Sequence, residues 1–245
     1  MGSKIVAVWG KENSGKTNFA VNLVCALANR NRIVGLISSN LIYGDLQVYF
    51  GQSVPPEKGL FRGLNDDNPN IGEKFAEYEE SKNLFFLSVP NHYTGLLCDS
   101  VTLKSVEQLI VAASLVFDIL IIDGSGDVTN PVSGVGLWMA ERIYTLYRPS
   151  IAGQMWHMSV EDFVRELHIK DKQTNIIQAP NGEFCDKTFK SLIELPFAYE
   201  LPFVKQASEL ENAGTPIYFF KDRACRRYIK VLEQISDEIC GGKGK

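Results

Sequence analysis

The segment from residue 4 to residue 30 constrains the fold of this chain more than any other part of its sequence. Lys4 to Trp9 is a short apolar run that stops at Gly10, as a buried parallel strand does. From Lys16 to Arg30, apolar residues recur at helical spacing. A strand, a glycine turn and a helix in this order form the repeating unit of a parallel sheet, so the segment predicts an α/β protein.

The turn between this strand and this helix matches the pattern G-x-x-x-x-G-K-S/T at every fixed position. Its glycines let backbone N–H groups approach phosphate oxygens, and the following helix adds its positive N-terminal end. The ammonium of Lys16 can reach the β- and γ-phosphates, and the Thr17 hydroxyl can bind Mg²⁺. The alternative is a glycine-rich turn with solvated lysines, but the strand and helix around the turn favour a nucleoside triphosphate site. Its predicted residues are Gly10, Lys11, Glu12, Asn13, Ser14, Gly15, Lys16, Thr17 and Asn18.

Asp123 is the predicted acidic partner of this loop. It follows the apolar run Ile119 to Ile122, so a carboxylate stands where a buried strand ends and can hold Mg²⁺ directly or through water. The alternative role for Asp123 is to cap the turn Gly124-Ser125-Gly126. The chain has no N-K-x-D or T-K-x-D segment that would hydrogen-bond guanine, so we expect ATP with Mg²⁺.

The rest of the chain continues the alternation of strands and helices. We therefore predict a single domain over residues 1–245, with a three-layer, doubly wound, mostly parallel sheet and helices on both faces. Residues 51–82 are polar and rich in glycine and proline, and are expected to form loops with one short helix. Further strands are predicted at 33–37, 84–89, 119–122, 143–147 and 175–177, an edge strand at 217–220, and helices at 101–117 and 223–239.

Composition limits the classes of partner. The chain of 245 residues is 45% hydrophobic and has a formal net charge of −4, which argues against broad electrostatic binding to DNA or to acidic lipid. Its N-terminus does not resemble a secretory signal, and no apolar run approaches the roughly 18 residues of a spanning helix. We expect a cytoplasmic protein.

Lys11 gives the loop a family resemblance. The segment K-E-N-S-G-K-T, from Lys11 to Thr17, resembles the deviant Walker A motif K-G-G-x-G-K-T/S of the ParA/MinD superfamily of ATPases. In that family the first lysine reaches across an ATP-bound dimer to the partner's phosphate, so the resemblance implies this role for Lys11, an ATP-dependent homodimer and a P-loop fold of the SIMIBI/MinD type. The chain departs from the motif at Glu12 and Asn13, where the family has two glycines.

A second segment is similar to the CpaE/TadZ branch of this superfamily, which acts in pilus assembly and polar localisation. Leu36 to Gly51 resembles that branch's L-x-D-x-D-L-x-x-G-D-x-x-x-x-x-G. The resemblance implies a switch protein that positions or scaffolds a pilus or secretion-type assembly through a protein partner. The family's two switch aspartates fall on Ser38 and Asn40, and an amide cannot accept a proton as a carboxylate can. We therefore predict slow ATP hydrolysis, with Lys11, Lys16 and Asn40 as the catalytic set and Asp45 as a structural residue.

The late part of the chain supplies a candidate adenine pocket. Leu201-Pro202 and the later Ala213-Gly214-Thr215-Pro216 resemble the late loop of the same branch, and Gln178 stands where the family strand normally ends in Asn-Arg. Gln178 could offer an amide to the base, with Leu201 and Pro202 on the face of the base. An exposed polar residue at a strand end is the alternative for Gln178.

Three other functions remain open at this stage. A small-molecule kinase or synthetase would use the same loop but needs an acceptor site. A DNA-partition ATPase would use a basic surface, for which the only candidate is Arg223, Arg226, Arg227 and Lys230. Membrane binding by the last helix is not favoured, because we expect its apolar stripe to pack on the sheet.

Overall fold

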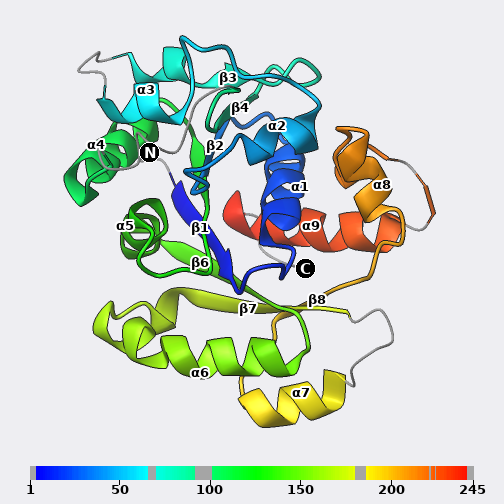
Figure 1. The fold of residues 1–245 in the computed structure, drawn as a ribbon. Helices are drawn as coiled ribbons and strands as arrows, with labels where there is room; N and C mark the ends of the chain where they lie inside the picture. Colours follow the sequence, from blue (N-terminus) through cyan, green and yellow to red (C-terminus); the bar gives the residue numbers. More distant parts are fainter. Residues whose placement is uncertain are drawn as a thin grey trace.

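The fold is built on one eight-stranded sheet in the order β3-β4-β2-β5-β1-β6-β7-β8 (Figure 1). The computed structural model describes residues 4–65, 70–91, 101–179, 186–220, 222–223 and 225–241, so the ends of the predicted domain lie outside the described residues. All strand pairs are parallel except that of β3 with β4. The strands are β1 Lys4–Gly10, β2 Val34–Ser38, β3 Ala76–Glu77, β4 Leu84–Leu87, β5 Ile119–Asp123, β6 Arg142–Tyr147, β7 Gln173–Gln178 and β8 Tyr199–Leu201.

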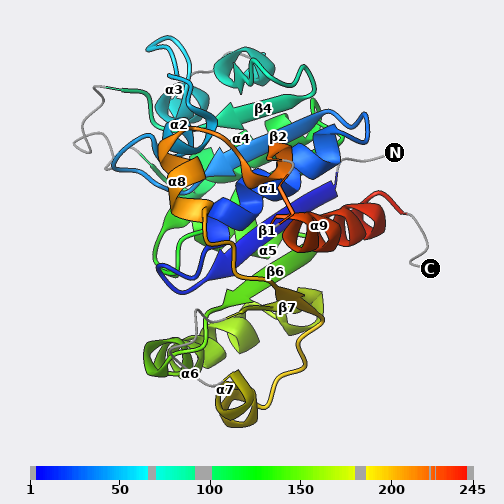
Figure 2. The ribbon, with the colours of Figure 1, turned by 90° about the vertical axis from the view of Figure 1, so that its right-hand side faces the viewer.

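Helices cover both faces of the sheet, which confirms the predicted three-layer architecture (Figures 1 and 2). Helices α1, α2, α8 and α9 pack on one face, and α3 to α7 pack on the other. The α-helices are α1 Lys16–Ala28, α2 Asp45–Phe50, α3 Leu60–Asn65, α4 Leu103–Ser114, α5 Pro131–Met139, α6 Ile151–Glu166, α7 Asp186–Ile193, α8 Ala207–Asn212 and α9 Arg226–Ile239. Short 3-10 helices lie at η1 Ile71–Lys74, η3 Lys170–Lys172 and η4 Ile217–Phe219.

The central strands are apolar because both of their faces are covered. Along β1, Val6 and Val8 enter the cluster beneath α1, whereas Ala7 and Trp9 enter the cluster beneath α5 and α6. All four side chains are at most 2% exposed. A strand buried on both faces reads as a continuous hydrophobic run, which is why β1 and β5 could be recognised in the sequence.

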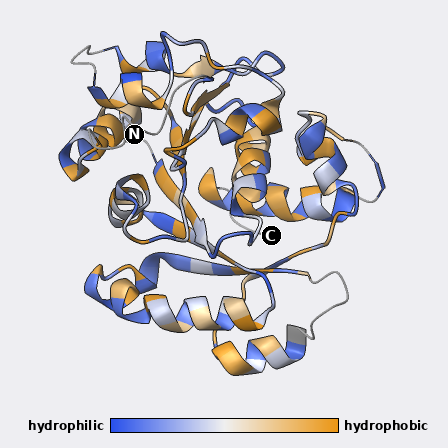
Figure 3. Ribbon diagram, in the orientation of Figure 1, coloured by the Kyte–Doolittle hydropathy of each residue, from blue (hydrophilic) through white to orange (hydrophobic). Residues whose placement is uncertain are grey.

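The last helix has one apolar face, and that face is buried. Tyr228, Leu232, Ile235 and Ile239 of α9 join the cluster that contains α1, as predicted. Figure 3 shows hydrophobic and hydrophilic residues interspersed along this helix. Among the described residues, none of the helices combines the length and apolar character needed to span a bilayer.

Several expectations for the chain's edges were wrong. Residues 217–220 do not form an edge strand, because Ile217–Phe219 is the 3-10 helix η4 and the strand at that edge is the three-residue β8. Residues 51–82, apart from 66–69, which are not described, contain the short helices α3 and η1 but also β3. Short elements of two to six residues carry too little periodicity to be recognised from sequence.

Candidate nucleotide-binding site

The predicted phosphate loop lies at the carboxyl end of β1, near the middle of the sheet. Gly15 has φ +84°, a left-handed conformation that favours glycine, and it caps the N-terminus of α1. A Cβ at Gly10 would lie 2.5 Å from the Leu146 carbonyl oxygen, so no larger residue fits beside β6. These two glycines set the tight turn that leads directly into the N-terminal end of α1.

Two polar side chains of the loop are buried. Lys16 is 7% exposed and Ser14 is 1% exposed. The Ser14 hydroxyl is buried without a hydrogen-bond partner among the described residues. A buried ammonium and a buried, unpartnered hydroxyl next to a helix N-terminus are suited to an anion, because the ammonium attracts negative charge and the hydroxyl would gain a hydrogen bond.

Glu12 supplies an anionic partner within the loop itself. Its carboxylate lies 3.3 Å from Lys16 Nζ, and its other oxygen accepts hydrogen bonds from Gly126 N at 2.8 Å and Ser125 Oγ at 3.1 Å. Partial burial opposes ionisation of Glu12, but the charge of Lys16 and the hydrogen bonds from Gly126 and Ser125 hold its pKa below the usual value. Glu12 therefore connects the phosphate loop to the loop that follows β5.

Asp123 and Thr17 lie together, as a shared Mg²⁺ site requires. The Asp123 carboxylate ends β5, pairs in register with Val8 of β1, and accepts a hydrogen bond from the Thr17 side chain. Its Oδ1 is buried without a hydrogen-bond partner among the described residues. Burial, helped by the nearby Asp45 carboxylate, raises the pKa of Asp123 to about 7. An oxygen donor set with one unpartnered, buried carboxylate oxygen fits Mg²⁺, which prefers oxygen ligands.

The end of β2 forms the third side of the site. Ser38 pairs in register with Asp123, and its hydroxyl donates to the buried Asp45 carboxylate at 2.8 Å. Asp45 also accepts from Ser88 Oγ at 3.2 Å and from the Leu46 N–H at 2.9 Å. Burial raises the pKa of Asp45, which these hydrogen bonds oppose. Asp45 thus starts α2 and fixes it to the sheet, in agreement with the predicted structural role.

Asn40 is engaged within its own loop. Its side-chain oxygen accepts from the N–H groups of Ile42 at 3.0 Å and Tyr43 at 3.2 Å. Its own N–H donates to Ser38 Oγ at 3.0 Å. The amide therefore stabilises the turn that follows β2.

The loop after β5 makes contacts that the sequence did not predict. Besides its contacts with Glu12, Gly126 accepts a hydrogen bond from Trp156 Nε1 at 3.1 Å. Asn130 caps α5 and donates to the Ser39 carbonyl at 2.9 Å, which connects this loop to the end of β2. In the sequence, the loop was marked only by its position after a strand that ends in Asp. Its contacts could not be predicted because they join residues far apart in the chain.

Of the candidate base-binding residues, only Gln178 lies against the phosphate loop. Gln178 ends β7, and a Cβ at Gly15 would lie 2.7 Å from its Nε2, so its amide stands over the phosphate loop. Leu201 is fully buried in the core, and Pro202 is half-buried. Asn18 directs its side chain along α1 and towards α9, where its Oδ1 accepts from Tyr228 Oη at 3.3 Å.

The loop's remaining residues lie at the surface. Asn13 has φ +62°, a left-handed conformation that asparagine tolerates better than most residues, and it occupies one of the family's glycine positions. Lys11 is half-buried, and its Nζ donates to the Glu12 carbonyl at 3.1 Å.

Comparison with known proteins places this geometry in a recognised fold. No protein-family model matches the sequence. The chain is 22% identical over 227 residues to the septum site-determining protein MinD of Thermotoga maritima, an alignment that covers 89% of this chain and 81% of that protein. The structure of MinD complexed with Mg-ADP from Pyrococcus horikoshii superposes with a TM-score of 0.79 at 17% identity and 98% coverage of both chains. A ParA-family ATPase from Chlorobium tepidum gives a TM-score of 0.79 at 16% identity, covering 96% of this chain and 99% of that one. The chain therefore has the three-layer α/β fold of MinD and of ParA-family P-loop ATPases.

Proposed function

We propose that this protein is a nucleotide switch that binds Mg-ATP at the loop Gly10 to Thr17 and pairs with a second copy in that state. The observation that carries the proposal is the convergence of Lys16, Thr17 and Asp123 at the carboxyl ends of neighbouring strands, where one buried Asp123 oxygen has no hydrogen-bond partner in the described part of the chain. Its fold is shared with a MinD that was solved with Mg-ADP, which supports the choice of ligand.

Each residue has a separate task in the proposed complex. Backbone N–H groups from Gly15 onward and the ammonium of Lys16 would bind the phosphates, while Thr17 and Asp123 would hold the cation. Mg²⁺ would neutralise part of the phosphate charge when bound. Because phosphate and the Glu12 carboxylate compete for Lys16, nucleotide binding would release Glu12 from this ion pair.

Lys11 carries the pairing step of the proposal. It lies half-buried on the loop, and the one hydrogen bond that the structure gives for its side chain goes to the adjacent Glu12 carbonyl. An ammonium at this position can reach a phosphate across an interface, as the family resemblance implies. The output would be the docking of a protein partner, in a pilus or secretion-type assembly according to the similarity of Leu36 to Gly51 with that branch.

The oligomeric state with and without Mg-ATP tests this proposal. We expect the wild type to dimerise on ATP and Lys11→Ala to bind ATP with unchanged affinity but remain monomeric in light-scattering measurements. Lys104→Ala, at an exposed position on α4, is the matched control and should dimerise normally. Absence of calorimetric ATP binding by the wild type would overturn the nucleotide site. Full dimerisation of Lys11→Ala would overturn the pairing role.

Slow hydrolysis is the second part of the proposal. Ser38 and Asn40 occupy the positions of the family's switch acids, and in this structure the Asn40 side chain is held by the turn that it caps. Neither residue can act as a general base as a carboxylate does. In single-turnover assays, Asn40→Asp should hydrolyse ATP about 100-fold faster or more, since a general base typically contributes about 100-fold to 10,000-fold. Equal rates for the two proteins would show that a missing carboxylate is not what limits turnover.

Binding of the ATP-bound dimer to DNA is the alternative output. Arg223, just before α9, and Arg226, Arg227 and Lys230 in its first turns are all exposed, and the fold is shared with a ParA-family ATPase. Binding to duplex DNA that requires ATP and weakens steeply with salt would favour this output over docking of a protein.

A further inference from the structure

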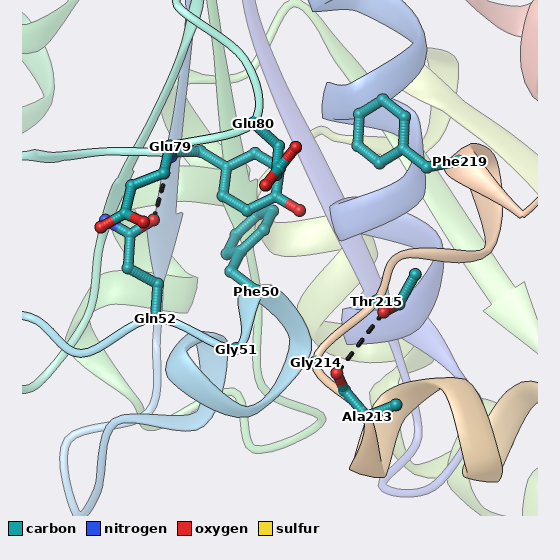
Figure 4. Close-up of a pocket in the computed structure, with 10 residues that line it drawn as sticks. Phe50, Gly51, Gln52, Glu79, Glu80, Ala213, Gly214, Thr215 and Phe219 are labelled. Atoms are coloured by element: carbon teal, nitrogen blue, oxygen red, sulfur yellow. Dashed lines mark hydrogen bonds between the residues drawn. The ribbon is translucent and has the colours of Figure 1, made fainter.

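A pocket outside the nucleotide site lies where three distant segments of the chain meet (Figure 4). Its volume is about 400 Å³. One wall comes from the end of α2, the second from the turn between β3 and β4, and the third from the segment that joins α8 to η4. The pocket is distinct from the phosphate loop, none of whose residues line it.

The wall between β3 and β4 is acidic. Glu79 and Glu80 are adjacent, exposed and part of the lining. Neither carboxylate forms an ion pair or hydrogen bond with any residue in the described part of the chain. Lysine and arginine are absent from the described lining, so this negative charge is not neutralised inside the pocket. A cation entering the pocket would meet a carboxylate without displacing an existing partner.

Aromatic rings form the floor and the opposite wall. The Tyr78 ring lies 4.8 Å from the Phe50 ring and 6.2 Å from the Phe219 ring, measured between centroids. In Figure 4, Phe219 faces the pocket from the side opposite Glu79. Ring faces attract cations, and the attraction is stronger in partly desolvated places such as a pocket.

The hydroxyl of Tyr78 lacks a partner. Tyr78 lines the pocket and is 4% exposed, yet its side chain forms no hydrogen bond with any described residue. Burial first, and the nearby Glu80 among the remaining causes, raise the pKa of Tyr78 to about 12, so the group stays a hydroxyl at neutral pH. The hydroxyl is therefore available to accept a hydrogen bond from a polar ligand that enters the pocket.

Two helix ends complete the pocket. Helices α2 and α8 finish next to each other, at Gly51 with φ +59° and at Gly214 with φ +64°. A Cβ at Gly214 would lie 2.3 Å from Gly51 Cα, so the two chain segments touch through their backbones. Carbonyl groups at the C-terminal ends of helices carry partial negative charge, which adds to that of the two glutamates.

We propose that this pocket receives an arginine side chain from a segment of a partner protein. A guanidinium group is planar and weakly hydrated, and it can stack on an aromatic ring while donating to a carboxylate. The exposed ring of Phe219 and the carboxylates of Glu79 and Glu80 offer this combination. The pocket is within the size range of sites that enclose small organic groups.

The surroundings of the pocket favour a polypeptide over a free cation. Val48 on α2 is 44% exposed, Phe219 is 38% exposed and Phe220 is 37% exposed. A backbone that carries the arginine would cover these apolar groups, whereas a small hydrophilic cation would leave them in water. The proposal does not depend on nucleotide binding.

The test is a titration of the ¹⁵N-labelled protein with acetyl-Gly-Arg-Gly-amide, followed by amide chemical shifts. We expect shifts at Gly51 and Gly214, weaker binding of the lysine peptide and no shifts with the glutamate peptide. Glu79→Gln with Glu80→Gln should weaken binding about tenfold or more, because charge-assisted hydrogen bonds are lost. Tyr78→Phe should weaken it less, since the ring remains.

The matched control changes two adjacent exposed carboxylates elsewhere, Glu161→Gln with Asp162→Asn on α6, and should leave the affinity unchanged. Equal weakening by the control pair would mean that net charge alone attracts the peptide, and would overturn the proposal. So would an arginine peptide that causes no shifts at the pocket. Spermidine binding as tightly as the arginine peptide would overturn the assignment to a protein partner.

Discussion

At the scale of single residues, Glu12 distinguishes this phosphate loop from one made of glycines. A carboxylate beside a phosphate site is unfavourable unless it has another partner, and here it has Lys16, Ser125 and Gly126. Its side chain is 61% exposed, so it can turn into water when a phosphate takes Lys16. A nucleotide bound as proposed would therefore have to displace the contact between Glu12 and Lys16.

Removing this charge should strengthen binding. We expect Glu12→Gln to bind Mg-ATP several-fold more tightly, because a charge about 4 Å from a phosphate contributes about 1 kcal/mol of repulsion at the dielectric constant of water, and 1.4 kcal/mol is a factor of ten. Titration calorimetry measures the change, and Glu57→Gln, at an exposed position away from the loop, is the control. Weaker binding by Glu12→Gln would show that Glu12 supports the bound loop.

The residues of the site were predictable to different degrees. Lys16, Thr17 and Asp123 were predictable because motif spacing and strand ends are local properties of the sequence, and the structure brings the three together. The contacts of Trp156 and Asn130 were not, because they depend on which loops meet across the sheet. No local sequence pattern predicts which distant loops will contact each other.

At the scale of elements, burial decided which strands and helices the sequence revealed. β1 and β5 are covered on both faces and read as apolar runs, and α9 shows its stripe because one face meets α1 and the other meets water. The edge strand β8 has three residues and α2 has six, which is less than two helical turns. Such elements are held by tertiary contacts, such as the hydrogen bond from Ser38 to Asp45 at the start of α2, and these are not visible as periodicity.

Helix α2 also connects the two candidate sites. It begins at Asp45, which is bonded to the end of β2, and it ends at Gly51 beside the acidic pocket. A six-residue helix spans about 9 Å at 1.5 Å per residue, so any shift of the loop after β2 would move a wall of the pocket. Helix α2 is thus the element through which the nucleotide site and the acidic pocket could influence each other.

At the scale of the whole molecule, the strand ends place several charged groups in one buried region without satisfying all of their polar atoms. The carboxyl ends of β1, β2 and β5 bring Lys16, Asp45 and Asp123 into one buried region, and Asp123 Oδ1 is left without a hydrogen bond there. An unsatisfied buried group lowers the free energy of unfolding, whereas a ligand that binds only the folded state raises it. Stability in the nucleotide-free state is thus reduced by the same arrangement that would hold the cation.

Asp123→Asn should separate these two effects. Without ligand at pH 7.5 we expect the variant to be more stable than the wild type by about 1–3 kcal/mol, since the variant buries no charge. Because the pKa of Asp123 is raised to about 7 in the folded protein, the wild type loses stability as pH rises from about 4 to 7, and the advantage of the variant should grow over this range and then level off. Excess Mg-ATP should reduce the advantage of the variant, because saturation at about 100 times Kd adds about 2.7 kcal/mol to the wild type and less to a variant with a weakened cation site. Urea denaturation at pH 5 and 7.5, with and without Mg-ATP, measures the stability difference, its pH dependence and its response to ligand, with Asp171→Asn as an exposed control.

A variant that is less stable than the wild type without ligand would contradict this prediction. It would mean that the Asp123 carboxylate stabilises the folded chain, and that its unpartnered oxygen is not kept available for a cation.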